Sequence, residues 1–226
     1  MGKKGLSQEG LKIIACVTML LDHIGAVFCS GVGLRIVGRL AFPIYCFLLA
    51  EGVCHTKNPK KYALRLLVGA LLSELPFDLL FFGEITPAHS SVMVTLLIGF
   101  LYLWAAKGTD RAGLKVLLAI PFVLLAELLG SDYGGAGVVM IALFAFTREV
   151  PHSRLIQAAG LTALCWLMGG MTVRIGAFRL PVEMFAVAAL IPIFCYSGRK
   201  ATASRAVQWI FYLFYPAHLT ALLLIQ

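Results

Sequence analysis

Two adjacent ionisable residues, Asp22 and His23, lie inside a long apolar stretch near the start of the chain. A charged side chain at the centre of a bilayer costs about 3 kcal/mol, so such residues mark a functional site. Lys12 lies eleven residues before His23, and eleven steps of 100° return to within roughly 20° of the same helical face. At 1.5 Å per residue, a lysine at the membrane surface places the imidazole roughly 16 Å away, near the middle of the hydrocarbon core.

Charged pairs also occur in the next two apolar segments. Arg35 and Arg39 are four residues apart, as are Glu74 and Asp78, so each pair lies on one helical face. One interpretation is that these residues and Asp22 only neutralise one another as buried ion pairs. Two intramembrane histidines beside them favour a chemical role instead.

The histidines, His23 and His218, are predicted to lie at about the same depth in the membrane. Histidine takes and returns a proton near neutral pH, and a neighbouring carboxylate fixes its tautomer. Asp22 points about 100° away from His23, so Glu74 or Asp78 is an equally good partner. We expect His23 to be a general base and keep His218 as a second candidate. The alternative for His218 is a helix-packing hydrogen bond near a proline kink.

A second polar group is predicted at the cytoplasmic end, where Glu51 and His55 precede the basic sequence KNPKK and Lys12 lies at the same level. Positive charge there suits the phosphates of a cytosolic donor. The alternative for the KNPKK lysines is ordinary membrane topology and contact with anionic lipids.

At the outer side, the loop GSDYGGAG and three charged residues are expected to line an opening; these residues are Arg174, Arg179 and Glu183. The acidic and aromatic residues Glu127, Asp132 and Tyr133 are interpreted equally well as turn and interface residues.

The composition is that of an integral membrane protein, with 60% hydrophobic and 13% charged residues, because soluble domains carry about 25% charged residues. The net charge of +8 is dispersed among short loops, which argues against a nucleic-acid partner. The six cysteines form no CxxC pair and lie mostly in apolar runs, so we expect neither a metal site nor a disulfide. The first apolar segment is too long for a cleaved signal peptide and is expected to be retained.

Hydropathy predicts an all-α, polytopic integral membrane protein of about nine transmembrane helices, forming a single domain over residues 1–226. The expected spans are Leu11–Phe28, Leu34–Val53, Ala63–Phe82, Val92–Ala106, Leu114–Leu129, Ala136–Phe146, Leu155–Met168, Leu180–Tyr196 and Val207–Ile225. With a cytoplasmic N-terminus, the 19 lysines and arginines fall on the inner side except for Arg35, Arg39, Arg174 and Arg179. Such an asymmetry is typical of the positive-inside rule.

Several stretches resemble the TraX family of membrane proteins, whose named member is linked to N-terminal acetylation of a conjugative pilin subunit. The likeness runs almost end to end and rests on LKIIACVTMLLDHIGAVF, GRLAFPI, EGVCHT, SELPFD, SDYGGAGV and FYPAHL. The family in turn resembles the broader transmembrane acyltransferases. Those that act on the bacterial cell envelope carry a basic residue, ten residues and a histidine in their first span. Lys12 and His23 match that pattern.

The resemblance implies acyl transfer from acetyl-CoA, used as a co-substrate without a metal, by a multi-pass protein of a bacterial inner membrane. The leading hypothesis is an acyltransferase in which His23 is the general base toward an acceptor amine or hydroxyl. The other residues expected to take part in catalysis are Asp22, Glu74, Asp78 and His218, and those expected to bind the donor are Lys12, Arg35, Arg39, Glu51 and His55. The expected partners are the acyl-CoA donor, membrane lipids, and an acceptor that is a peptide amine, a glycan or a lipid.

Two other classes of function remain open. A proton-coupled transporter would use Asp22, His23, Glu74 and Asp78 as a relay, although no inverted repeat is evident in the sequence. An intramembrane protease ranks lowest, because the chain has neither an HExxH nor a GxSxG sequence.

Overall fold

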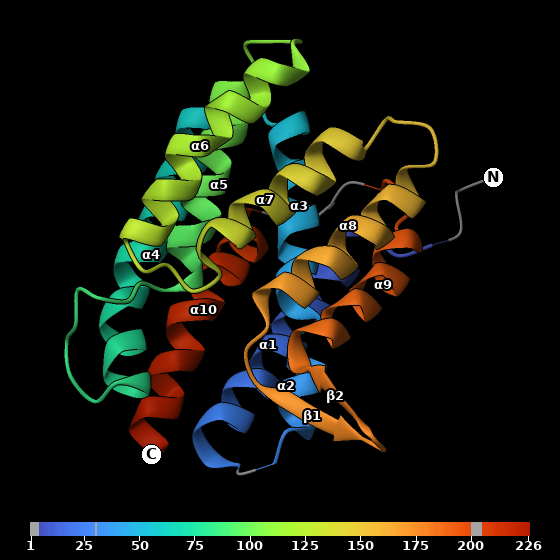
Figure 1. The fold of residues 1–226 in the computed structure, drawn as a ribbon. Helices are drawn as coiled ribbons and strands as arrows, with labels where there is room; N and C mark the ends of the chain where they lie inside the picture. The colour runs from blue at the N-terminus through green and yellow to red at the C-terminus, as the bar shows by residue number, and fades with distance from the viewer. Residues whose placement is uncertain (1–4, 30, 200–204) are drawn as a thin grey trace. The chain divides into compact units, whose positions relative to one another are not determined.

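The computed structural model describes residues 5–29, 31–199 and 205–226 (Figure 1). The elements in chain order are α1 (Gln8–Phe28), α2 (Gly33–Gly38), α3 (Ala41–His55), α4 (Pro59–Phe81), α5 (Val92–Ala106), α6 (Ala112–Leu128), α7 (Gly134–Thr147), α8 (Ser153–Met168), β1 (Thr172–Ile175), β2 (Phe178–Pro181), the 3-10 helix η1 (Val182–Ala189), α9 (Leu190–Phe194) and α10 (Arg205–Ile225). The prediction of an all-α protein is confirmed, since the strands form only one short antiparallel hairpin in the described chain.

Capping residues explain where the long helices α1 and α4 begin. The Ser7 side chain accepts a hydrogen bond from the Gly10 amide at 3.1 Å and caps α1. Asn58 caps α4 in the same way, by accepting from the Lys61 amide at 3.0 Å, and Pro59 occupies the first helical turn. Side-chain caps satisfy amides that have no partner within the helix, and proline fits there because it lacks an amide hydrogen.

Two helical segments of the described chain, Gln8–Phe28 and Gly33–His55, are long and apolar enough to cross a membrane. Four shorter apolar helices accompany them, at Val92–Ala106, Gly134–Thr147, Val182–Phe194 and Trp209–Ile225. The fourth predicted span has the bounds of α5, but nine membrane crossings stay a prediction.

The eighth predicted span, Leu180–Tyr196, is wrong at its start. Leu180 and Pro181 belong to β2, and a helix begins only after them, first as the 3-10 helix η1 and then as α9. Gly176, with φ of 61°, starts the turn that pairs β1 with β2, and Pro181 has an extended ψ of 135°. The hairpin therefore takes residues that hydropathy alone assigns to a helix.

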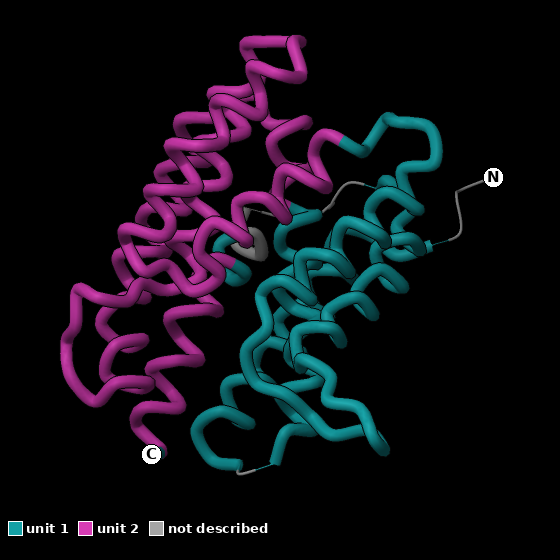
Figure 2. The backbone as a smooth tube through the Cα atoms, viewed as in Figure 1, with its two compact units in different colours: residues 1–48, 147–211, 226 teal, residues 49–146, 212–225 magenta. Residues whose placement is uncertain are grey.

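The chain forms two compact units, which Figure 2 draws in different colours. Unit 1 comprises residues 1–48, 147–211 and 226, and unit 2 comprises residues 49–146 and 212–225. Each unit is therefore assembled from separate stretches of sequence, and the boundaries fall within α3, α7 and α10. The prediction of a single domain stays a prediction.

Glycines allow close helix packing inside both units. In unit 1, a Cβ on Gly25 of α1 would lie 2.7 Å from the Cβ of Leu34 in α2. In unit 2, a Cβ on Gly69 of α4 would lie 2.6 Å from the Met93 side chain of α5. In membranes the hydrophobic effect does not drive helices together, and small residues let their backbones approach closely enough for van der Waals packing.

An apolar stripe on α6 is exposed along the whole helix. Val116, Ile120, Leu124 and Leu128 follow one another at four-residue spacing and are 69%, 51%, 62% and 83% exposed. Contiguous apolar surface of this extent is unusual on a soluble monomer and marks an interaction with an apolar partner or solvent.

Candidate functional site

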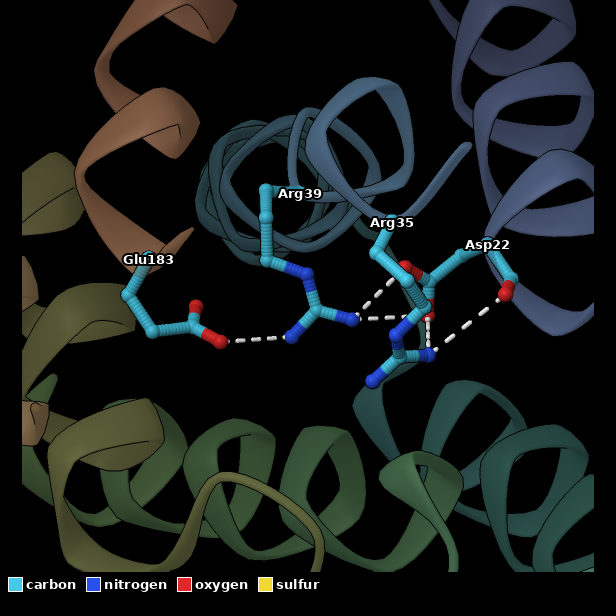
Figure 3. Close-up of polar contacts among 4 residues, drawn as sticks. All are labelled: Asp22, Arg35, Arg39 and Glu183. Carbon is cyan, nitrogen blue, oxygen red and sulfur yellow. Dashed lines mark hydrogen bonds and ion pairs between the residues drawn. The ribbon is translucent and has the colours of Figure 1, made fainter. Parts of the chain in front are cut away.

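Four charged residues of unit 1 form one connected network (Figure 3). Asp22 of α1 accepts hydrogen bonds from Arg35 Nη1 at 2.6 Å and from Arg39 Nη2, which lies 2.7 Å from each carboxylate oxygen. Arg39 Nη1 donates to Glu183 Oε1 of η1 at 2.6 Å. Arg39 therefore lies between two carboxylates and joins the beginning of the chain to η1.

The short helix α2 positions both arginines toward Asp22. They lie one turn apart, and Gly38 packs so tightly on the Asp22 side chain that a Cβ at position 38 would overlap it. The side chains of Asp22 and Arg39 are only 9% and 11% exposed, whereas that of Arg35 is 25% exposed. Two guanidinium groups and two carboxylates leave the network formally neutral, which offsets the cost of burying its charges.

From the sequence, Glu183 was expected only to line the outer opening and not to pair with Arg39. It lies in the first turn of η1, directly after β2, and 144 residues separate it from Arg39. The ion-pair interpretation therefore accounts for Asp22, Arg35 and Arg39, provided that Glu183 is added to it.

His23 follows Asp22 on α1 and is buried, with 9% of its surface exposed. α1 runs unbroken from Gln8 to Phe28, so Lys12 and His23 lie on one helical face. Cys16 lies between them on this face and contacts the Tyr45 hydroxyl through its sulfur at 3.2 Å. A neighbouring face of α1, roughly 100–140° around the helix from Lys12, is exposed, as Ile13 and Val17 show.

Lys12 lies near the N-terminal end of the same face. Its Nζ is 5.1 Å from the centre of the Phe211 ring, at the start of α10. A cation over an aromatic face is held there electrostatically.

Glu74 and Asp78 belong to unit 2 and hold the loop between α4 and α5. Glu74 Oε1 accepts from the Ser91 amide at 3.1 Å, and Asp78 Oδ2 accepts from the Thr86 amide at 3.1 Å. Ser91 is the N-cap residue of α5, so Glu74 places negative charge at the start of that helix. Carboxylates at a helix N-terminus are favourable because the amides there lack helical partners.

His218 of α10 is buried in unit 2 beside Pro216. Its Nδ1 lies 2.8 Å from the Phe214 carbonyl oxygen, and its ring stacks on the Phe214 ring at 5.0 Å between centroids. Because a carbonyl only accepts, Nδ1 carries the proton and Nε2 is the basic nitrogen of the neutral ring. This hydrogen bond lies within α10 close to Pro216, and a role of His218 in proton transfer stays a prediction.

Glu51 and His55 are brought together at the end of α3. His55 Nε2 lies 3.6 Å from Glu51 Oε2, with Glu51 buried and His55 42% exposed. The three lysines of KNPKK that follow are exposed, at positions Lys57, Lys60 and Lys61. In residues 5–29, 31–199 and 205–226, no three His, Cys, Asp or Glu side chains are grouped so as to hold a metal ion.

Comparison with known proteins gives two matches over nearly the whole chain. The family model described as TraX protein matches residues 7–226. A probable fimbrial assembly protein, FimC of serogroup H1, from Dichelobacter nodosus is 31% identical over 231 residues, covering 94% of this chain and 92% of that relative. No solved structure matches the chain.

Proposed function

This chain belongs to the TraX family, and from that membership we propose that it is a membrane-embedded acyltransferase. It transfers an acetyl group from acetyl-CoA to an acceptor of the cell envelope. A relative named as a probable fimbrial assembly protein supports an acceptor among envelope or pilus components.

The observation that carries the proposal is the face of α1 that bears Lys12 and His23. A buried imidazole and a basic side chain share one unbroken helix, with the lysine nearer to its N-terminus. The rise between them is roughly 16 Å, which is of the same order as the length of an extended pantetheine arm. A donor held by its phosphates at Lys12 therefore reaches His23 with its thioester.

The exposed apolar surface supports a location in the bacterial inner membrane with several crossings. The stripe from Val116 to Leu128 on α6 is buried in a bilayer without any protein partner. The long apolar helix α1 supports the same placement.

In the proposed reaction, His23 takes the proton of the acceptor amine or hydroxyl. The acceptor nitrogen or oxygen bonds to the thioester carbon, and negative charge develops on the carbonyl oxygen. Arg35 is the more exposed arginine of the network and is the donor available to that oxygen. The C–S bond then breaks, and the imidazolium returns the proton to the leaving thiolate.

The test is mass spectrometry of cell-envelope peptides and glycans from cells that make the wild type, His23→Ala or no protein. We expect an acetyl mass on one component in cells that make the wild type, and no such mass in cells that make His23→Ala or no protein. The matched control is His152→Asn, which changes an exposed loop histidine whose positive φ suits asparagine. An acetyl mass that persists in His23→Ala would remove His23 from the mechanism.

The alternative is a proton-coupled transporter that uses the same buried charges. It predicts substrate flux in proteoliposomes without consumption of acetyl-CoA. Measuring free thiol release and substrate flux on the same preparation separates the two functions.

A further inference from the structure

The hairpin β1–β2 in unit 1 has no part in the proposed acyl transfer. It leaves the end of α8 as an arm and returns to η1 (Figure 1). The antiparallel register pairs Thr172 with Pro181, Val173 with Leu180, Arg174 with Arg179, and Ile175 with Phe178. The Val182 amide donates to the Met171 carbonyl at 2.8 Å and closes the base of the arm.

The register gives the hairpin two chemically different faces. Successive side chains of a strand point to opposite faces, so Arg174 and Arg179 share one face. The apolar residues share the other face; they are Val173, Ile175, Phe178 and Leu180. Ile175 and Phe178 at the tip are 54% and 80% exposed, and both arginines are exposed as well.

This arrangement is unfavourable in plain water. Like charges directly opposite each other in a ladder destabilise it, and an isolated two-stranded hairpin is marginally stable at best. The hairpin is therefore stabilised by surroundings that bury its apolar face and place negative charge next to Arg174 and Arg179 on its other face.

A membrane interface with anionic lipids meets both requirements. Acyl chains accept Ile175 and Phe178, while lipid phosphates lie at the level of the arginines and bind guanidinium groups through two parallel hydrogen bonds. Each arginine near an anionic surface strengthens such binding.

We propose that the hairpin is an interfacial anchor, in which Arg174 and Arg179 together bind the phosphate of an anionic phospholipid headgroup and Phe178 inserts among the acyl chains. The inference rests on the membrane location in the proposed function and is independent of the acyl transfer.

The test uses the purified full chain in lipid nanodiscs. A tryptophan reporter replaces Phe178 in a background in which Trp104, Trp166 and Trp209 are changed to Phe. Its fluorescence is measured in phosphatidylcholine nanodiscs with increasing phosphatidylglycerol, using lipids with brominated acyl chains as quenchers.

We expect quenching of the reporter to rise with phosphatidylglycerol. The double variant Arg174→Gln/Arg179→Gln should need roughly tenfold more phosphatidylglycerol for the same quenching. Arg174→Lys/Arg179→Lys keeps the charge and should recover part of the effect. Inorganic phosphate added to phosphatidylcholine nanodiscs should leave the quenching unchanged, because the anchor requires a lipid.

A matched reporter at Ile85 controls for general insertion. Ile85 is 70% exposed in the loop between α4 and α5 and lies outside the hairpin that carries the two arginines. Quenching of an Ile85→Trp reporter should therefore not depend on phosphatidylglycerol. Quenching of the Phe178→Trp reporter that ignores phosphatidylglycerol would remove the phosphate site. A reporter that stays unquenched in every nanodisc would place the arm in water and overturn the anchor, whatever the acyl-transfer assay gives.

Discussion

Gly38 lies against the Asp22 side chain so closely that position 38 has no room for a Cβ atom. The contact joins α2 to α1 at the residue that binds both Arg35 and Arg39. The geometry of the charged network thus depends on an uncharged residue.

Gly38→Ala should disrupt the network without changing any charge. The added methyl group pushes the Asp22 carboxylate away from its two arginines, and we expect a loss of about 1–3 kcal/mol in stability. Thermal unfolding in detergent measures the change. Gly33→Ala in the same helix is the control, since nothing lies within 4 Å of a Cβ there, and it should be neutral or slightly stabilising. Equal effects of the two variants would contradict the packing argument.

Arg39→Gln should be more harmful than the loss of an exposed arginine. It leaves Glu183, whose side chain is only 16% exposed, without its 2.6 Å partner, and breaking a largely buried pair costs about 3–5 kcal/mol. The double variant Arg39→Gln/Glu183→Gln should recover part of this loss in an unfolding assay, because it no longer leaves a lone charge. Arg111→Gln, at an exposed position, is the control. Strictly additive effects of the two substitutions would mean that the pair is not coupled.

Glu74→Ala should loosen the start of α5. The Ser91 amide loses its 3.1 Å acceptor, at a cost of about 1–3 kcal/mol. Hydrogen-exchange mass spectrometry of the segment around Ser91 should show faster exchange, while Glu74→Gln keeps an acceptor oxygen and should exchange nearly as the wild type does. Glu84→Ala, at an exposed loop position, serves as the control. Unchanged protection in Glu74→Ala would show that this bond does not hold the loop.

Lys12→Ala should weaken acetyl-CoA binding in a salt-dependent way. If the lysine holds a donor phosphate, its removal lowers affinity more at low than at high ionic strength, with a smaller effect on turnover at saturating donor. Equilibrium binding at two ionic strengths measures this, with Lys107→Ala as an exposed control. Equal affinities of the wild type and Lys12→Ala would make Lys12 a topology anchor only.

Helix positions followed from the sequence where local signals agree. Hydropathy placed α5 at its observed bounds, and it placed the end of α1 at Phe28, although the observed helix begins at Gln8 rather than at Leu11. The start of the eighth predicted span failed because a turn at Gly176 competes with hydropathy, and the pairing of two short strands is not a local signal.

The sequence predicted most of the residues that form the charged network, but fewer of the pairs that they form with one another. The spacing of Arg35 and Arg39 indicated a shared face, and both meet Asp22. Glu183 as the second carboxylate depends on how η1 packs on α2, which no sequence pattern gives. Glu74 and Asp78 were expected to orient a histidine, and the structure adds the backbone amides of Ser91 and Thr86 as their partners.

The separation of Arg39 from Glu183 has a consequence for biosynthesis. Asp22, Arg35 and Arg39 leave the ribosome together and carry one surplus positive charge, which persists until Glu183 is made. At translation rates of 5–20 residues per second, 144 residues take roughly 7–30 s. During this interval the nascent first helices lack the carboxylate that pairs with Arg39 Nη1, so the packing of η1 on α2 completes the charge balance of the network.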